Sequence, residues 1–364
     1  MKILHYINGL GAGGAEKLLT DILPIMKKQG HEVHLLISNK KNLVGKYFDI
    51  LTREGIPVKN LQLSNFNPLQ VYHLIKYLRR ERFDIVHAHI FPSQYWLAFA
   101  SFFTPSRTKL IKSEHNFFNN RRRYKVLQLM ERVVYNRYAM VISITTDVDA
   151  SLIAWLQRVR TIVIPNGVNL EQIERERAAG KDVIYDFLKP GHYNILMVGR
   201  FSGVKDQNTL IQAMVHLPAH YHLFFAGWGP LIEAAKQFSE QMGLTERVHF
   251  LGMRTDVYSL MNRVDLNVLS TYFEGLSGVT LESLASGKPF IGSDVSGVNN
   301  IVPDSRLLFP IRQPELLAQK IKEISLNETL SREMVKISLQ HVKRYDIKNM
   351  CNQYLSVYEE ISRH

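Results

Sequence analysis

Short apolar runs alternate with longer segments of helical periodicity along the first half of the chain. The runs are rich in β-branched residues, and the segments between them carry apolar residues three or four positions apart, as between Leu18 and Met26. This alternation predicts βαβ units around a parallel sheet. The strands predicted for the first half are residues 2–8, 31–38, 84–89, 109–114 and 139–144.

The same alternation returns after a polar interval. Residues 164–167 have the composition of a turn, and residues 171–189 are polar and charged. The strands predicted beyond this interval are 194–198, 222–226, 247–251, 265–269, 289–292 and 306–309. The pattern therefore predicts an α/β fold with two doubly wound sheets. Such sheets bind ligands at the carboxyl ends of their strands, which suggests a cleft between the two domains.

Length and composition fit this two-domain organisation. The chain has 364 residues, of which 46% are hydrophobic and 21% charged, so we expect it to be folded throughout. The predicted domains are residues 1–170 and 171–345. A C-terminal helix at 346–364 is expected to pack back on the first domain.

Cysteine content and apolar runs indicate the compartment. Cys351 is the single cysteine, which excludes an internal disulfide and a cysteine-rich zinc site. The longest apolar run, 95–103, is about half as long as a membrane-crossing helix. The N-terminus also lacks the pattern of a signal peptide. We therefore expect a cytoplasmic protein.

The net charge of +12 is unevenly distributed. Residues 1–180 hold 26 Lys and Arg against 14 Asp and Glu, whereas residues 181–364 hold 19 of each. A basic half suits a nucleic acid, an anionic membrane face or a phosphorylated substrate, so charge alone leaves all three open.

A glycine-rich loop follows the first predicted strand. Gly9, Gly11 and Gly14 match the G-x-G-x-x-G spacing of dinucleotide-binding loops. Residues 38–41 read Ser-Asn-Lys-Lys, so the acid that would hold a ribose is missing, which argues against an NAD site. The backbone N–H groups of a helix N-terminus would still favour a phosphate. The alternative is a glycine turn that only permits close packing.

Two loops of the second half carry further candidate chemistry. Arg200 and Lys205 lie on one loop, and two such cations suit a diphosphate. Glu274 precedes a predicted helix and Glu282 lies about one turn inside it, so a phosphate could bind the N–H groups between them. Sugar hydroxyls could then bond to either carboxylate. Solvated surface side chains remain the alternative for both loops.

Five motifs occur in the order and spacing of one enzyme family. They are Gly13-Gly14-Ala15-Glu16, residues 164–168, Gly199-Arg200 with Lys205-Asp206, Phe250-Leu251-Gly252, and residues 274–285 with Gly287-Lys288-Pro289. Over essentially its whole length the chain resembles the retaining family 4 glycosyltransferases (glycosyl transferases group 1). The resemblance implies the GT-B fold, with two Rossmann-like domains facing a central cleft. It also implies that the first domain binds an acceptor and the second a nucleotide-sugar.

The resemblance assigns roles to individual residues. His115 and Glu274 would lie beside the transferred sugar, and Arg200 and Lys205 would neutralise the donor diphosphate, so these four are the predicted catalytic residues. Glu282 would bind the ribose hydroxyls. Further donor contacts are expected from Gly13, Gly14, Met253, Arg254, Gly275, Leu276 and Ser277. The residues expected on the acceptor side are Glu16 and His89.

Two departures from the family leave the sugar and the base undefined. Leu276-Ser277-Gly278 stands where many members have Gly-Phe-Gly. Trp228 stands where an acid or a glycine is commoner.

His87 and His89 lie on the same side of their predicted strand. As a metal pair they lack a third ligand nearby, and the family needs no metal. We therefore expect no metal, and no cofactor besides a UDP- or GDP-sugar acting as the substrate. A packed strand-end histidine is the alternative for His89.

The basic excess is concentrated in a predicted helix over residues 119–140. Arg121, Lys125, Gln128 and Arg132 would share one face, and the aromatic and aliphatic residues another. Such a helix, from Arg121 to Arg132, can lie on an anionic membrane surface. The alternative is a solvated helix packed on its own domain.

These observations predict a metal-independent retaining glycosyltransferase. It would move a hexose or N-acetylhexosamine from a nucleotide-diphosphate sugar to a lipid-linked or polysaccharide acceptor in cell-surface glycan biosynthesis. It would work as a peripheral protein on the inner membrane face. The alternative is a sugar-nucleotide epimerase of the same architecture. A nucleic-acid partner is not expected, because the basic helix lacks a base-reading motif.

Overall fold

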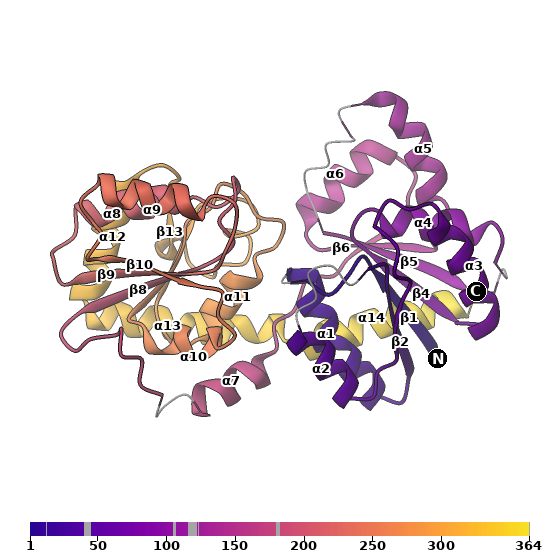
Figure 1. Cartoon of the computed structure of the whole chain (residues 1–364), viewed down its shortest axis with the longest axis horizontal. Coiled ribbons are helices and arrows are strands. Elements are labelled where there is room, and N and C mark those ends of the chain that lie inside the picture. The colour runs from indigo at the N-terminus through magenta and orange to yellow at the C-terminus, as the bar shows by residue number, and fades with distance from the viewer. Residues whose placement is uncertain are drawn as a thin grey trace. The chain divides into compact units, whose positions relative to one another are not determined.

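Two compact units divide the chain (Figure 1). The computed structural model describes residues 1–11, 13–39, 45–104, 107–115, 122, 124–179 and 183–363. Unit 1 comprises Met1–Gly167 with Ile347–His364, and unit 2 comprises Val168–Asp346. The divisions therefore fall within three residues of the predicted boundaries. Each unit holds a parallel sheet flanked by helices, which confirms the α/β class.

In the described part of unit 1 the strands follow the order β3-β2-β1-β4-β5-β6-β7. They are β1 (Lys2–Ile7), β2 (Glu32–Ile37), β3 (Val58–Asn60), β4 (Ile85–His89), β5 (Lys109–Glu114), β6 (Met140–Ser143) and β7 (Thr161–Val163). The helices are α1 (Gly14–Lys28), α2 (Gly45–Arg53), α3 (Leu69–Glu81), α4 (Ser93–Ser101), α5 (Lys125–Tyr135), α6 (Thr146–Leu156) and α14 (Ile347–Ser362). The edge strands β3 and β7 were not predicted from the sequence.

The sheet of unit 1 buries apolar residues on both faces, as a parallel sheet must. Ile3 and Ile7 point to the face covered by α1 and α14, whereas Leu4 and Tyr6 point to the face covered by α3, α4 and α6. The apolar stripe predicted for α1 is buried, because residues from Leu18 to Met26 pack on this sheet. Two separate cores therefore hold unit 1 together.

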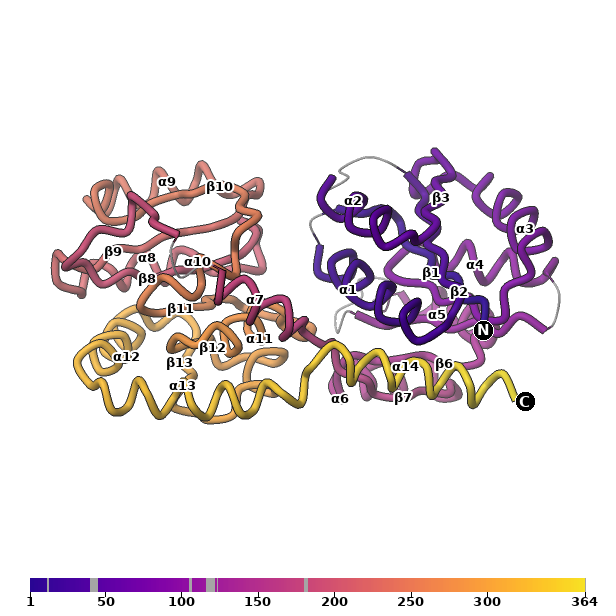
Figure 2. The backbone as a smooth tube through the Cα atoms, turned by 90° about the horizontal axis from the view of Figure 1, so that it is seen from below, coloured from indigo at the N-terminus to yellow at the C-terminus, as the bar shows by residue number. Residues whose placement is uncertain are grey.

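The C-terminal helix α14 is part of unit 1. Figure 2 shows it, in yellow, running back along this unit to the C-terminus. Its apolar side, with Met350, Cys351, Tyr354 and Tyr358, joins the core cluster that contains Ile3 of β1. This core thus joins the C-terminal helix to strands and helices from the first 167 residues.

In the described part of unit 2 the strand order is β10-β9-β8-β11-β12-β13. The strands are β8 (Tyr193–Val198), β9 (Tyr221–Ala226), β10 (Val248–Gly252), β11 (Leu266–Leu269), β12 (Phe290–Ser293) and β13 (Leu308–Phe309). The helices are α7 (Leu170–Ala179), α8 (Gln207–Val215), α9 (Ile232–Gln241), α10 (Val257–Arg263), α11 (Gly278–Ala285), α12 (Pro314–Leu326) and α13 (Glu328–Val342), with short 3₁₀ turns at Ser305–Leu307 and Lys343–Tyr345.

The helix predicted over residues 119–140 is too long at its C-terminal end. α5 spans only Lys125–Tyr135, and β6 starts at Met140. The chain turns after Tyr135, where the Arg137 guanidinium lies over the Phe102 ring at 4.5 Å and donates to Ser101 Oγ at 2.9 Å. Arg121 lies outside the described residues, as does Arg123. The basic helix from Arg121 to Arg132 is therefore described only from Lys125 onward.

Candidate active site

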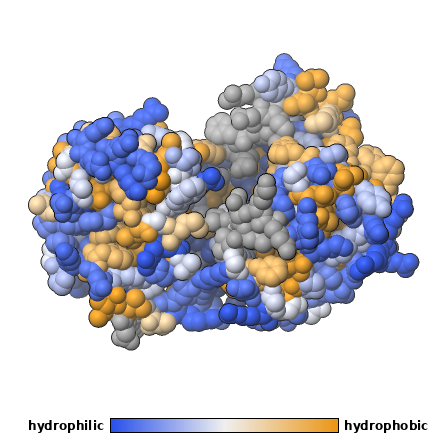
Figure 3. All heavy atoms as spheres, viewed as in Figure 1, coloured by the Kyte–Doolittle hydropathy of each residue, from blue (hydrophilic) through white to orange (hydrophobic). Residues whose placement is uncertain are grey.

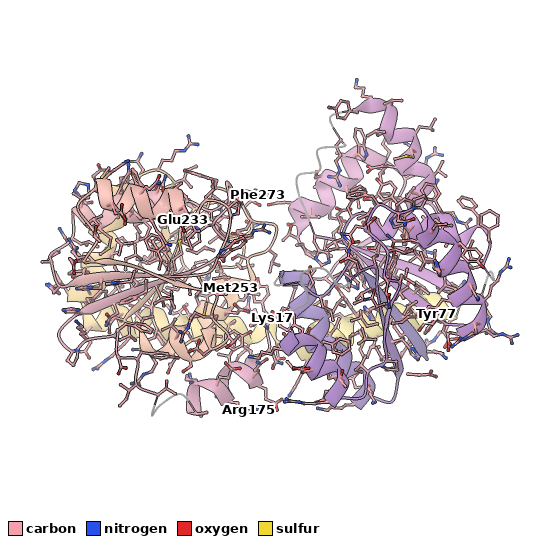
Figure 4. All side chains as sticks on the ribbon, in the orientation of Figure 1. Lys17, Tyr77, Arg175, Glu233, Met253 and Phe273 are labelled. Atoms are coloured by element: carbon pink, nitrogen blue, oxygen red, sulfur yellow. The ribbon has the colours of Figure 1, made fainter. Side chains whose placement is uncertain are left out.

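The candidate donor site lies at the carboxyl edge of the sheet of unit 2. β8, β9, β10 and β11 are parallel, so the loops that follow them leave the sheet at the same edge. These loops carry nearly all the donor-side residues that the sequence predicts for this unit. Figure 4 shows Met253 and Phe273 on this side of the unit.

Lys205 and Glu274 come from different loops and form an ion pair. Their side chains are only 14% and 16% exposed. The loops are held together by backbone hydrogen bonds, in which Tyr272 N donates to Val204 O at 2.9 Å and Asp206 N donates to Ser270 O at 3.0 Å. The structure therefore brings together two of the predicted catalytic residues, 69 positions apart in the sequence.

Arg200 precedes Lys205 on the same loop, and its side chain is exposed. Two glycines that the sequence analysis did not single out shape this loop. A Cβ added to Gly227 (φ +152°) would lie 1.9 Å from the carbonyl oxygen of Gly199, and one on Gly229 would lie 2.1 Å from that of Phe201. The intervening Trp228 is 60% exposed. The loop after β9 must therefore be glycine-rich to pack against the loop that carries Arg200.

Glu282 lies in the second turn of α11, and Glu274 precedes that helix, as the spacing predicts. Tyr258 Oη donates to Glu282 Oε1 at 3.1 Å. Ser277 caps α11, because its Oγ accepts from Thr280 N at 3.2 Å. The N–H of Ser277 donates to the carbonyl of Gly297 at 3.0 Å. The contact predicted between Ser277 and the donor would therefore have to replace or share this hydrogen bond.

Met253 and Arg254 follow β10. Met253 is 65% exposed, whereas the Arg254 guanidinium donates twice to Asp256, at 2.9 and 2.6 Å. Tyr185 Oη donates to the same carboxylate at 2.9 Å. This pairing with Asp256 raises the pKa of Arg254. Met253 thus offers an apolar surface next to a positioned cation.

In unit 1, Gly13 and Gly14 begin α1 as predicted, and Gly13 is the N-cap. A Cβ on Gly13 would lie 2.2 Å from Glu16 Oε2, so the Glu16 side chain folds back over the start of the helix. Burial raises the pKa of the Glu16 carboxyl, and a hydrogen bond from its own backbone N–H partly offsets this rise. A carboxylate of the chain itself therefore lies at the helix N-terminus where the sequence predicts a phosphate.

Four histidines gather toward the carboxyl ends of β1, β4 and β5. His5, which the sequence analysis did not single out, pairs in register with His87, and its Nδ1 lies 3.0 Å from His89 Nε2. The ring of His115, just beyond β5, lies 5.9 Å from that of His89. Burial lowers the pKa of His5 to about 3 and that of His115 to about 4, so both imidazoles are neutral at pH 7.

The statement that His87 and His89 lack a third ligand nearby is wrong, because the ligand atoms of His5, His87 and His89 all lie within 4.8 Å of one another. The register of parallel strands, and not the sequence spacing, brings His5 to the pair. Both nitrogens of His87 are bonded, however, to Tyr358 Oη at 2.6 Å and to Ser113 Oγ at 2.9 Å. A metal ion would have to displace one of these partners, so the cluster fits a hydrogen-bonded network better than a metal site.

Comparisons with known proteins identify the family. The model described as Glycosyltransferase Family 4 matches residues 12–172, and that described as Glycosyl transferases group 1 matches residues 192–327. The solved structure of Anabaena HepE in complex with UDP and glucose superposes with a TM-score of 0.84 at 20% identity, covering 99% of this chain and 100% of that one. The chain belongs to the GT-B glycosyltransferases. The predicted glycosyltransferase family and the predicted GT-B fold are confirmed, whereas the retaining mechanism stays a prediction.

Relatives of this glycosyltransferase cover nearly its whole length. A putative glycosyltransferase, EpsF of Bacillus subtilis (strain 168), is 26% identical over 98% of this chain and 96% of its own. The 4-alpha-N-acetylgalactosaminyltransferase of Campylobacter jejuni named for a diphospho-undecaprenol substrate is 23% identical over 95% of this chain and 96% of its own. WaaG, a glycosyltransferase involved in lipopolysaccharide biosynthesis, shares the fold with a TM-score of 0.71 at 18% identity over 98% of this chain and 99% of its own.

Proposed function

We propose that this glycosyltransferase is a retaining enzyme that moves a hexose or N-acetylhexosamine from a UDP- or GDP-sugar to a lipid-linked or polysaccharide acceptor. The observation that carries the proposal is the pairing of Lys205 with Glu274 at the carboxyl edge of unit 2, with Arg200 on the same loop as Lys205. Two similar proteins support the donor and acceptor classes, because HepE was solved in complex with UDP and glucose and the Campylobacter jejuni enzyme is named for a diphospho-undecaprenol substrate.

Stabilisation of the leaving group would supply most of the catalysis. As the glycosidic bond to the diphosphate breaks, negative charge grows on the phosphate oxygens, and Arg200 and Lys205 would neutralise it. Lys205 is already oriented by Glu274, so little reorganisation would be needed when the donor binds. Glu282, oriented by Tyr258, would hold the ribose hydroxyls.

The retaining outcome would follow from attack on the face that the phosphate leaves. Glu274 is paired with Lys205, and a carboxylate bonded to a cation is a weak nucleophile, so a covalent glycosyl-enzyme is not the expected route. The departing phosphate oxygen would instead take the proton of the acceptor hydroxyl. Glu274 would then bond a hydroxyl of the transferred sugar, and His115 and Glu16 would contact sugar and acceptor from unit 1.

Donor binding and transfer can be tested together with a panel of UDP-, GDP- and ADP-sugars. A true donor raises the melting temperature because it binds only the folded state. With an acceptor present, the nucleoside diphosphate should appear in equal amount to glycosylated acceptor. Conversion of the donor to another nucleotide-sugar, with no nucleoside diphosphate released, would instead identify an epimerase.

We also propose that unit 1 contacts the cytoplasmic face of an anionic membrane through α5. The outer side of this helix is apolar and not basic, since Val126, Leu129 and Val133 are 81%, 70% and 49% exposed. Figure 3 shows hydrophobic atoms gathered over this helix. Lys125 and Arg137 flank them, which suits insertion of apolar side chains beside anionic headgroups. Among the described helices, none has the length and hydropathy needed to span a bilayer.

Vesicle co-sedimentation tests the membrane proposal. Wild-type protein should pellet with anionic vesicles, and the Val126→Ser/Leu129→Ser variant should stay in the supernatant. Val215→Ser/Leu326→Ser removes two exposed apolar side chains from unit 2 and serves as the matched control. Wild-type protein that remains in the supernatant at low salt would show that α5 does not bind lipid.

A further inference from the structure

Two tyrosines of the C-terminal helix bond to polar groups of the central strands in unit 1. Tyr358 Oη lies 2.6 Å from His87 Nδ1 of β4, and Tyr354 Oη lies 3.2 Å from Ser113 Oγ of β5. Both tyrosines are fully buried. They are the polar members of a helix face that is otherwise packed in an apolar core.

The two contacts belong to one hydrogen-bonded chain, because His87 Nε2 lies 2.9 Å from Ser113 Oγ. The order is Tyr358, His87, Ser113, Tyr354. Burial raises the pKa of both tyrosines, so each keeps its proton and can donate. Burial also lowers the pKa of His87 well below its usual range, which keeps the imidazole neutral, with one donor and one acceptor nitrogen. The tautomer of His87 and the directions of its hydrogen bonds to Tyr358 and Ser113 are therefore coupled.

This row of hydrogen bonds adjoins His89, a candidate acceptor-side residue, and His115, a predicted catalytic residue. The rings of His87 and His89 stack with centroids 4.2 Å apart, and Ser113 is the register partner of His89. His115 follows Ser113 by two residues, and its ring lies 5.9 Å from that of His89. A change at His87 or Ser113 would therefore reach both His89 and His115 through direct neighbours.

Among the residues that the structure describes, His89 and His115 have few hydrogen-bond partners. His89 Nδ1 and His115 Nε2 are buried and have no hydrogen-bond partner within the described ranges. His89 is bonded through its other nitrogen to His5. Since few bonds restrain these two rings, their orientation must come largely from the groups packed against them.

We propose that Tyr354 and Tyr358 are positioning residues, which act through Ser113 and His87 to hold His89 and His115 in one orientation. The inference rests on the proposed roles of His89 and His115 in glycosyl transfer. Neither tyrosine would touch a substrate. Helix α14 would thus serve the acceptor side of the site in addition to covering the core.

Conservative variants test this inference. Tyr358→Phe and Tyr354→Phe each remove one hydroxyl and keep the ring. Tyr6→Phe is the matched control, because the Tyr6 hydroxyl is equally buried and bonded to Ser38 and Gln70, but it lies on the opposite face of the same sheet. The measurements are the imidazole ¹⁵N shifts in histidine-labelled protein, the dissociation constant of the nucleoside diphosphate, and kcat for transfer.

Tyr358→Phe should shift the ¹⁵N resonances of His87 and His89, and Tyr354→Phe those of His87 and His115. Each variant should lower kcat by roughly 3- to 10-fold, which is the size expected when one net hydrogen bond no longer helps to position the histidines. Nucleoside diphosphate binding should be unchanged, because the predicted nucleotide-binding side chains belong to unit 2. Tyr6→Phe should leave the shifts and kcat at wild-type values.

Unchanged His89 and His115 shifts in both tyrosine variants would overturn the inference, as would shifted resonances with wild-type kcat. If Tyr358→Phe does not fold, Tyr354→Phe removes the hydroxyl at the other end of the hydrogen-bonded chain and tests the same inference. A wild-type protein that transfers no sugar would refute the proposed function. The ¹⁵N shifts would still decide whether α14 holds the histidines.

Discussion

Acidification below pH 6.5 should destabilise unit 1 strongly. Its sheet buries His5, His87 and His89, with His115 beside them, and burial lowers the pKa of all four. In the unfolded chain a histidine has a pKa of about 6.5. As the pH falls, the unfolded state therefore binds protons that the folded state does not bind, so the free energy of unfolding decreases.

The size of this effect can be worked out for His5 and His115. The pKa of His5 is about 3 and that of His115 about 4, so at pH 5 both stay neutral in the folded state while their unfolded counterparts are almost fully charged. Each of these two histidines therefore lowers the free energy of unfolding by about 2 kcal/mol between pH 7 and pH 5. The two together cost about 4 kcal/mol, and His87 and His89 act in the same direction. This loss is large, because the free energy of unfolding of a whole domain is only about 5–15 kcal/mol.

Urea unfolding followed by tryptophan fluorescence measures this loss. Unit 2 contains a single tryptophan, Trp228, so a Trp228→Phe background reports on Trp96 and Trp155 of unit 1. In that background His5→Gln should reduce the fall in unfolding free energy between pH 7 and pH 5 by about 2 kcal/mol. His216→Gln, which replaces an exposed histidine of unit 2, is the control. An unfolding free energy for unit 1 that is equal at pH 7 and pH 5 would refute the reasoning.

Three further predictions concern the donor site. Arg200→Ala and Lys205→Ala should each lower kcat by ~10²-fold, because each removes a charge that stabilises the departing diphosphate; near-normal rates in both would exclude that role. Glu282→Ala should raise the dissociation constant by roughly 10-fold, equally for the nucleoside diphosphate and the intact donor, since the ribose is common to both. Calorimetry that shows an unchanged constant for the diphosphate would contradict the ribose contact. Gly227→Ala should weaken donor binding, because its Cβ would lie 1.9 Å from the Gly199 carbonyl and displace the Arg200 loop. Donor affinity at the wild-type level would show that this close approach is dispensable.

The central strands of both sheets could be predicted from the sequence because most are short, largely apolar runs between segments of helical periodicity. The edge strands β3 and β7 are three residues long, and none of their residues is fully buried. Without burial there is no apolar pattern to detect, so these strands were missed.

Helix α5 shows why an amphipathic pattern did not identify the outer face. The sequence places basic and apolar residues on different faces, which predicts a basic outer face. In the structure Val134 and Tyr135 are buried, while Val126 and Leu129 point to solvent. Both sides of the helix carry apolar residues, so periodicity could not decide which side packs on the domain.

At the candidate site, sequence motifs identified Lys205 and Glu274, but only the structure shows their ion pair. His5 was missed because a lone histidine in an apolar strand carries no local signal, and it acquires a role only through its register with His87. The fold of the Glu16 side chain over Gly13 depends on its rotamer, which spacing does not determine. The roles of these residues in catalysis stay predictions.

The stereochemistry of transfer tests the central claim most directly. An NMR spectrum of the product, recorded after transfer from an α-linked UDP- or GDP-sugar to a defined acceptor, reports the configuration at the new anomeric centre. We expect an α-linked product, formed in equal amount to the released nucleoside diphosphate. A β-linked product would contradict the retaining mechanism and would require a general base on the opposite face of the sugar.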